Sequence, residues 1–112
     1  PAPAAVALVT LGVDDLPRAT RFYEEIGFAK SASQSRDSVS FFRAGGVVLG
    51  LFDRRALAED AGLPPGERTA FGGITLARNL PSREAVDAAF AQALAAGATP
   101  LQPPRKVFWG GY

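Results

Sequence analysis

The sequence contains neither histidine nor cysteine. Without cysteine there is no disulfide framework and no thiolate nucleophile. Without histidine, none of the serines has the side chain that usually activates a serine nucleophile. Transition-metal sites need several nitrogen, sulfur or oxygen donors, and here only carboxylates remain to supply them. The two absences therefore weigh against cysteine, serine and transition-metal chemistry.

The chain also lacks an excess of one charge and a long apolar run. Twelve basic and eleven acidic residues give a formal charge of +1, so no basic field is available for nucleic acid or an anionic membrane surface. No apolar run approaches the ~20 residues that span a bilayer, and the opening PAPAA lacks the pattern of a signal peptide. We expect no nucleic-acid partner, no membrane partner and a cytoplasmic location.

What is present is an ordinary globular composition. The 112 residues are 47% hydrophobic and 21% charged, which is typical of a chain that folds. A chain of this length builds one core rather than two independent ones. We expect residues 1–112 to form a single domain.

The first half of the chain has the pattern β-α-β-β-β. Apolar residues cover both faces of 6–13, which predicts a buried strand. Helical spacing then predicts a helix over about 16–26 that is capped by Asp14 or Asp15 and ends at Gly27. Three strand patterns follow, FAKSASQ, SVSFFRA and VVLGLF, the last two separated by Gly45-Gly46. Residues 54–69 look like a linker with one short helical turn.

The same plan restarts near Ile74. GGITLARN predicts a strand, Ser82 or Asn79 caps a helix that ends at Gly97, and LQPPRKVFWGGY supplies one strand and the start of another. This division gives a first module at about 5–53, a linker at about 54–69 and an incomplete second module at about 70–112.

The second module has no counterpart of the strand that ends the first one at Phe52. The same spacing, counted from Gly97, runs past Tyr112. We expect the chain to continue beyond Tyr112, because an unpaired apolar edge invites aggregation. The alternative is that a partner supplies the missing strand.

Tandem modules of this kind, with VTLGVDDLPRATRFYEEIGF opening the first and SREAVDAAFAQALAAGATPLQPP in the second, resemble the vicinal oxygen chelate superfamily. That superfamily contains glyoxalases, bleomycin-resistance proteins and extradiol dioxygenases. The resemblance implies an α+β fold in which tandem β-α-β-β-β modules form a cup-shaped mixed sheet. It also implies a homodimer, since several relatives assemble their cups across a two-fold interface.

The resemblance also indicates where a metal would be bound. In the metal-dependent members, His or Glu side chains on the opening and closing strands of the modules hold a divalent ion. By the resemblance these positions fall at Leu8, at or next to Gly73 and near Gly50, and none of the three can bind a metal. The acidic residues lie at helices, caps and the linker. We therefore expect a member without the family's metal site and without a cofactor.

Strand alternation predicts which side chains line the cup. One set from each strand packs under the helix, and the other set faces the cup. On SVSFFRA the parity is ambiguous, and we choose Ser40 and Phe42 for the inner face. The predicted cup-facing residues are Leu8, Thr10, Gly12, Ser40, Phe42, Val48, Gly50, Phe52, Gly73, Thr75 and Ala77.

Two aromatic residues near the end of the sequence complete the predicted site. Trp109 and Tyr112 stand where the second module would close over the cup, so we interpret them as an aromatic wall for a planar ligand. The alternative is packing in the core or at a dimer interface. Arg43 and Arg78 at strand ends either bind a carboxylate or phosphate or are simply solvated. The predicted ligand-binding residues are Thr10, Phe42, Phe52, Thr75, Trp109 and Tyr112, and no residue is predicted to be catalytic.

Two functions fit this pattern. The first is a metal-free small-molecule-binding protein, similar to the bleomycin-resistance branch, in which a cleft holds a ligand by apolar and aromatic contacts. The second is a metal-dependent lyase or dioxygenase of the glyoxalase type, with metal donors from a further C-terminal segment or a partner chain. The sequence alone leaves open whether the protein is an enzyme, and a purely structural module is a third interpretation.

Overall fold

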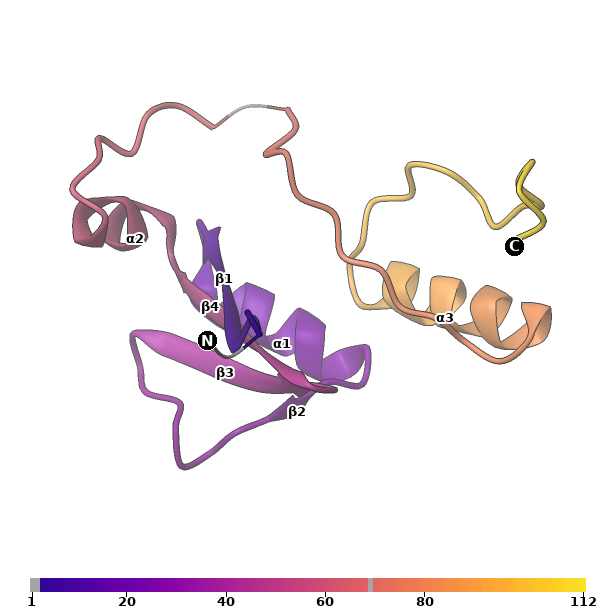
Figure 1. Ribbon diagram of the computed structural model, residues 1–112, viewed down its shortest axis with the longest axis horizontal. Helices are drawn as coiled ribbons and strands as arrows, with labels where there is room; N and C mark the ends of the chain where they lie inside the picture. Colours follow the sequence, from indigo (N-terminus) through magenta and orange to yellow (C-terminus); the bar gives the residue numbers. More distant parts are fainter. Residues whose placement is uncertain (1–2, 69) are drawn as a thin grey trace. The chain divides into compact units, whose positions relative to one another are not determined.

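The computed structural model describes residues 3–68 and 70–112. The chain divides into two compact units, Pro1–Glu67 (unit 1) and Arg68–Tyr112 (unit 2). In the described residues, unit 1 holds four strands and two helices, whereas unit 2 holds one helix (Figure 1). None of these helices has the length and apolar composition that crossing a membrane requires.

Unit 1 is built on a mixed sheet with the strand order β1-β4-β3-β2 (Figure 1). Strand β1 (Leu8–Val13) pairs parallel with β4 (Val47–Asp53). Strand β3 (Val39–Ala44) runs antiparallel to β4, and the short β2 (Ala29–Lys30) antiparallel to β3. The first module therefore has the predicted β-α-β-β-β order, and the α+β class with a mixed sheet is confirmed.

Helix α1 (Leu16–Glu25) lies in the crossover that parallel strands require. Its start follows the predicted chemistry, because the Asp15 carboxylate accepts a hydrogen bond from the Arg18 amide at 3.1 Å. Its end follows as well: Gly27 has φ 108°, a left-handed conformation that glycine adopts without a Cβ clash. The predicted helix over 16–26 is therefore confirmed to within one residue.

The core of unit 1 lies between α1 and one face of the sheet. Phe42, Leu49 and Leu51 are its buried apolar residues. Tyr23 of α1 packs on this cluster, with its ring centroid 6.0 Å from that of Phe42. Burial raises the pKa of the Tyr23 phenol, since the ionised form would lose hydration.

One polar contact crosses this apolar layer. The hydroxyl oxygens of Thr20 on α1 and Ser40 on β3 are 2.8 Å apart. Both residues are buried, and each hydroxyl satisfies the other. No buried side-chain polar atom in the described residues lacks a hydrogen-bond partner.

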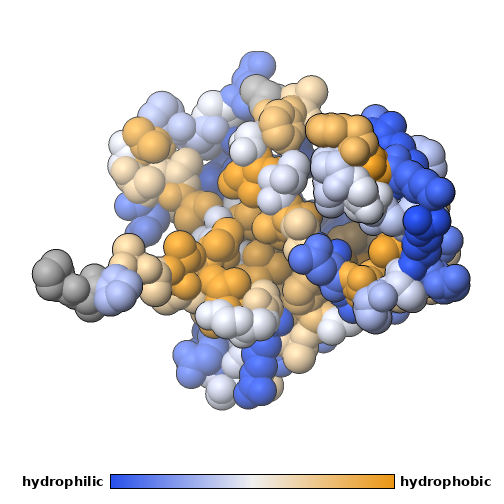
Figure 2. All heavy atoms as spheres, turned by 45° about the vertical axis from the view of Figure 1, so that its right-hand side comes forward, coloured by the Kyte–Doolittle hydropathy of each residue, from blue (hydrophilic) through white to orange (hydrophobic). Residues whose placement is uncertain are grey.

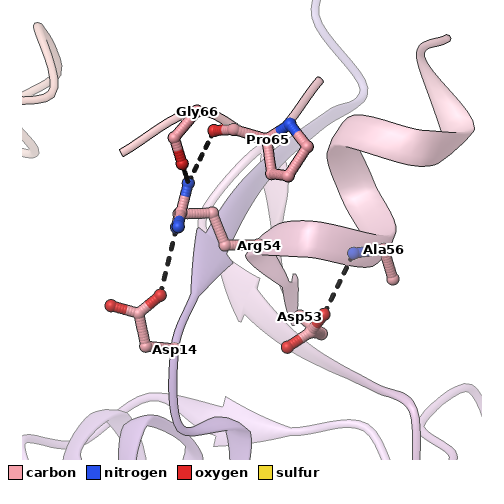
Figure 3. Close-up of polar contacts among 6 residues, drawn as sticks. All are labelled: Asp14, Asp53, Arg54, Ala56, Pro65 and Gly66. Carbon is pink, nitrogen blue, oxygen red and sulfur yellow. Dashed lines mark hydrogen bonds and ion pairs between the residues drawn. The ribbon is translucent and has the colours of Figure 1, made fainter. Parts of the chain in front are cut away.

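Helix α2 (Arg54–Asp60) begins directly after β4, with the Asp53 carboxylate accepting from the Ala56 amide at 3.0 Å. The predicted helical turn in the linker is thus confirmed. Arg54 donates from Nε to Asp14 at 3.1 Å and from Nη1 to the carbonyl of Pro65 at 2.8 Å (Figure 3). One guanidinium therefore ties the segment after α2 to the end of β1.

Unit 2 contains helix α3 (Arg83–Ala95), which Figure 1 draws in orange. Ser82 is its N-cap, and its hydroxyl accepts from the Ala85 amide at 3.0 Å. Of the two predicted caps, Ser82 is therefore the correct one, and the predicted helix is confirmed.

The strands predicted in the second module are wrong. Residues 70–112, all of which the structure describes, contain no strand, either at GGITLARN or at LQPPRKVFWGGY. Ile74 is 60% exposed and Leu76 is 51% exposed. An extended segment becomes a strand only when its backbone groups pair with another strand. In the described part of unit 2, the alternating apolar side chains lie on a segment whose backbone does not pair with another strand.

Candidate functional site

The sheet face of unit 1 opposite α1, here called the pocket face, follows from the strand register. Thr10 pairs with Gly50 of β4, which pairs with Phe41 of β3. In the neighbouring row Leu8 pairs with Val48, and Val48 with Arg43. Residues directly opposite each other in a sheet point to the same side. The pocket face is therefore formed by Leu8, Thr10, Gly12, Val39, Phe41, Arg43, Val48, Gly50 and Phe52.

Gly50 allows the side chains of this face to approach one another closely. A Cβ at Gly50 would lie 3.2 Å from Cε1 of Phe41 and 3.3 Å from both Cδ1 of Leu8 and Oγ1 of Thr10. Any larger residue at this position would push these three side chains apart. The missing side chain thus lets an aromatic ring, a leucine and a threonine meet over the middle of the sheet.

A pocket of about 410 Å³ lies on the pocket face, which is within the usual size for small-molecule sites. Leu8 is 45% exposed and Val48 is 38% exposed, so both leave apolar surface uncovered. Apolar side chains form patches on the surface seen in Figure 2. The residues that line the pocket are Ala7, Leu8, Ser31, Gln34, Phe41, Phe42, Arg43 and Val48.

The polar side of this pocket is a loop, residues 31–38, held against β3. The Ser31 amide donates to the carbonyl of Phe41 at 2.8 Å, and the Ser35 hydroxyl accepts from the Phe41 amide at 3.0 Å. The Gln34 amide donates to the Ser31 hydroxyl at 3.3 Å. These three hydrogen bonds, one between backbone groups and two from a backbone amide to a serine hydroxyl, thus fix Ser31 and Gln34 at the pocket's edge beside Phe41.

The charge of the pocket comes from Arg43. Among the described residues that line the pocket, it is the one ionisable residue, and none of them is a carboxylate. The side chain is exposed. In the part of the chain that the structure describes, its guanidinium has neither a hydrogen-bond nor an ion-pair partner. The pocket therefore has an apolar floor and an uncompensated positive charge on one side.

The prediction of which side chains lie on each face of the sheet is confirmed for β1 and β4 and is wrong for β3. Leu8, Thr10, Val48 and Gly50 lie on the pocket face, as predicted. The register places Gly12 and Phe52 there as well.

The error on β3 concerns Ser40 and Phe42, which face α1. The Ser40 hydroxyl contacts Thr20 of that helix. Phe42 is 1% exposed and packs against Tyr23, although it also borders the pocket.

The sequence contained the signal for the correct parity. The two-residue turn Gly45-Gly46 pairs Ala44 with Val47, and this register places Phe41, not Phe42, opposite Gly50. Phe41 was therefore missed although it could have been derived. Ser31 and Gln34 were missed because their positions depend on loop contacts that have no local pattern.

The remaining predicted site residues belong to unit 2. Thr75 lies in the strandless segment before α3, and Trp109 is 72% exposed with its ring over Gly111. The Tyr112 hydroxyl donates to Asp87 at 2.7 Å, and this hydrogen bond raises the pKa of the phenol. The guanidinium of Arg83 lies 5.3 Å from the centre of the Tyr112 ring. A ligand-binding role for the three residues stays a prediction, as it does for Thr10, Phe42 and Phe52.

The described residues do not fit the kind of metal site that the resemblance attributes to the metal-dependent members. Two of the expected ligand positions, Leu8 and Gly50, adjoin on the pocket face and carry no donor atom in a side chain. Among residues 3–68 and 70–112 no three His, Cys, Asp or Glu residues are close enough to hold a metal ion together. The side chains that line the pocket present carbon atoms, the neutral polar groups of Ser31 and Gln34, and the guanidinium of Arg43.

Comparison with known families agrees with the fold. Residues 5–112 match the Glyoxalase/Bleomycin resistance protein/Dioxygenase superfamily. The chain therefore belongs to this superfamily, and the resemblance noted in the sequence is confirmed. A comparison with curated proteins finds no match.

Several solved structures are similar to the chain. A glyoxalase-related enzyme from Fulvimarina pelagi shares 31% identity with a TM-score of 0.83, covering 96% of this chain and 75% of that one. A glyoxalase/bleomycin resistance protein/dioxygenase family enzyme from Burkholderia phytofirmans PsJN shares 24% identity with a TM-score of 0.85, covering 96% and 84%. A lactoylglutathione lyase from Agrobacterium tumefaciens shares 24% identity with a TM-score of 0.67, covering 97% and 81%.

Proposed function

We propose that the protein is a small-molecule-binding member of its superfamily that holds its ligand in the pocket of unit 1 without a metal ion. The observation that supports this proposal is that apolar residues form the floor of the pocket. Leu8 occupies a position where metal-dependent relatives are expected to have a metal ligand, and it lines the pocket together with Phe41 and Val48.

The physical basis of binding is burial of apolar surface that is exposed in the free protein. Leu8 and Val48 leave 45% and 38% of their surface uncovered. Covering a large apolar side chain fully is worth about 1.5–3 kcal/mol, so covering part of several of them supports binding of a small apolar body. Phe41 adds an aromatic surface on which a planar group can stack.

Binding is tested by titrating the full chain with a panel of small aromatic compounds while recording two-dimensional amide NMR spectra. Ligands of this pocket are expected to shift the signals of Leu8, Phe41 and Val48. Leu8→Ser is expected to weaken binding about tenfold, since it removes apolar contact worth on the order of 1–2 kcal/mol. Leu63→Ser is the matched control, because Leu63 is 62% exposed and does not line the pocket.

Two results would contradict the proposal. One is the absence of any shift at the pocket residues across the whole panel. The other is equal loss of affinity in the Leu8 and Leu63 variants, because binding would then lie elsewhere.

An enzymatic function is the second candidate. The 31% identity to a glyoxalase-related enzyme favours it. In that case the metal donors come from a further C-terminal segment or from a partner chain. Elemental analysis of the purified protein distinguishes the candidates, since a stoichiometric transition metal supports the enzyme and excludes the metal-free pocket.

The homodimer and the cytoplasmic location expected from the sequence belong to the same proposal. Membership in a superfamily whose members often pair supports the dimer. Light scattering after size exclusion measures the molar mass directly, and a monomer at all concentrations would contradict this part of the proposal.

A further inference from the structure

We infer that the pocket of unit 1 selects ligands with one anionic group, a carboxylate or phosphate, attached to an apolar or aromatic body, and that Arg43 is the residue that contacts the anion. This inference rests on the proposed function and specifies the ligand class. It follows from the distribution of charge in the lining of the pocket.

Arg43 stands at the boundary between the apolar and polar parts of the pocket. On β3 it pairs with Val48 of β4 on one side and with Ala29 of β2 on the other. Its direct neighbours across the sheet are therefore apolar. No protein acceptor in the described residues satisfies its five N–H groups, so they remain available to a ligand.

The other polar groups of the lining are neutral. Ser31 contributes a hydroxyl and Gln34 an amide, both at the edge beside Phe41. Neither supplies the negative charge that would compensate Arg43. A cationic ligand would be repelled by the guanidinium, and a purely apolar one would leave it without a contact. The planar fork of an arginine matches the two oxygen atoms of a carboxylate or phosphate.

A second hollow on unit 1, unlike the pocket, is lined by side chains of both charges. It is lined by Lys30 and Arg36 together with Glu24 and Asp37, so its cations have carboxylates nearby. Arg36 is also engaged, because its Nη1 donates to the carbonyls of Ser33 and Ser35 at 2.8 Å each. Anion selectivity is therefore expected at Arg43 and not at this hollow.

The experiment compares ligands that differ only in charge. The full chain is titrated with 1-naphthylacetate, its neutral amide 1-naphthylacetamide and 1-naphthyl phosphate, and amide NMR shifts of the pocket residues report binding. At least one anion is expected to bind about three- to tenfold more tightly than the amide, since the contact is charge-assisted but partly solvated. The preference is expected to fall as salt is added. The two anions distinguish carboxylate from phosphate recognition.

Variants assign the preference to a residue. Arg43→Gln is expected to remove the preference for the anion while the amide binds as before. Arg43→Lys is expected to retain part of it, because the charge remains and the fork is lost. Arg21→Gln is the matched control: the charge change is the same, but Arg21 is exposed on α1, on the other face of the sheet, and is expected to leave the preference unchanged.

The outcomes separate this inference from the proposed function. Equal affinity for acid and amide in the unchanged protein, or an unchanged preference in Arg43→Gln, overturns the inference and leaves small-molecule binding supported. Failure of all three compounds to shift the pocket residues overturns both.

Discussion

Units 1 and 2 have the same sequence plan, yet only unit 1 forms a sheet in the described residues. In unit 1 the strand residues Leu49 and Leu51 are 4% and 0% exposed, whereas Ile74 in unit 2 is 60% exposed. Helices form in both units, each with a side-chain cap, Asp15 for α1 and Ser82 for α3. The difference teaches that a helix is determined by signals within a few residues, whereas a strand also requires a partner far along the chain.

The largest expected effect on stability is that of a substitution at a buried residue of unit 1. Leu51→Ala removes a side chain that is fully buried in unit 1 and is expected to lower the free energy of unfolding by about 2–5 kcal/mol. Leu94→Ala on α3 is the counterpart in unit 2, where Leu94 is 38% exposed, and is expected to have a much smaller effect. Urea unfolding followed by circular dichroism measures both. Similar losses in the two variants would mean that the units do not differ in packing.

A smaller effect is expected where a glycine allows two elements to meet. A Cβ at Gly12 would lie 3.0 Å from the Cα of Arg54 at the start of α2, so Gly12→Ala is expected to destabilise unit 1 by about 1–3 kcal/mol. Gly46→Ala is the control, since no atom lies within 4 Å of a Cβ there. Thermal unfolding of both variants checks the prediction. A Gly12 variant as stable as the Gly46 variant would show that α2 moves without cost.

The helix of unit 2 provides the third comparison. Ser82→Ala removes the side-chain acceptor of the Ala85 amide and is expected to cost about 1 kcal/mol of local helix stability. Hydrogen exchange measured by NMR should show faster exchange in the first turn of α3 and unchanged exchange in the sheet of unit 1. Ser38→Ala, an exposed serine outside any helix, is the control. Equal exchange in both variants would mean that the cap does not stabilise α3.

The smallest effect concerns pH and Tyr112. Its hydroxyl donates to Asp87, and this hydrogen bond raises the pKa of the phenol above its usual value. A raised pKa means that the folded chain favours the protonated phenol. The hydrogen bond from Tyr112 to Asp87 is therefore fully formed below the ordinary phenol pKa of about 10. It is lost as the pH rises through the raised pKa of Tyr112 in the folded chain.

The Asp87→Asn variant tests this assignment. It is expected to lower the pKa of Tyr112, as followed by the ring signals of Tyr112 in NMR spectra during a pH titration. Tyr23 is an internal reference, because its pKa is raised by burial and not by a carboxylate. If Asp87→Asn left the Tyr112 titration unchanged, the hydrogen bond would not be its cause.

Much of unit 1 could be predicted from sequence because its signals are local. The cap at Asp15, the stop at Gly27 and the turn at Gly45-Gly46 each act within a few residues, and the structure agrees with them. The faces of β1 and β4 followed from alternation alone.

The errors arose where contacts between distant segments decide the outcome. Phe41 and Phe42 are adjacent and equally apolar, so only the register with β4 distinguishes them. The edge formed by Ser31 and Gln34 depends on hydrogen bonds from the loop to β3. The strands expected at GGITLARN and near Trp109 required pairing that no pattern within these segments could supply.

The contact between Thr20 and Ser40 has a consequence for how α1 can sit on the sheet. Apolar packing has no preferred direction and would tolerate a helix that slides or rotates slightly. The hydrogen bond between the two buried hydroxyls, 2.8 Å apart, forms at only one position of the helix. A shift of the helix by one turn, about 5.4 Å, would break it and leave two buried polar groups without a partner, at a cost of about 1–3 kcal/mol each. The two hydroxyls thus fix the position of α1 on the sheet, while apolar packing supplies most of the stabilisation.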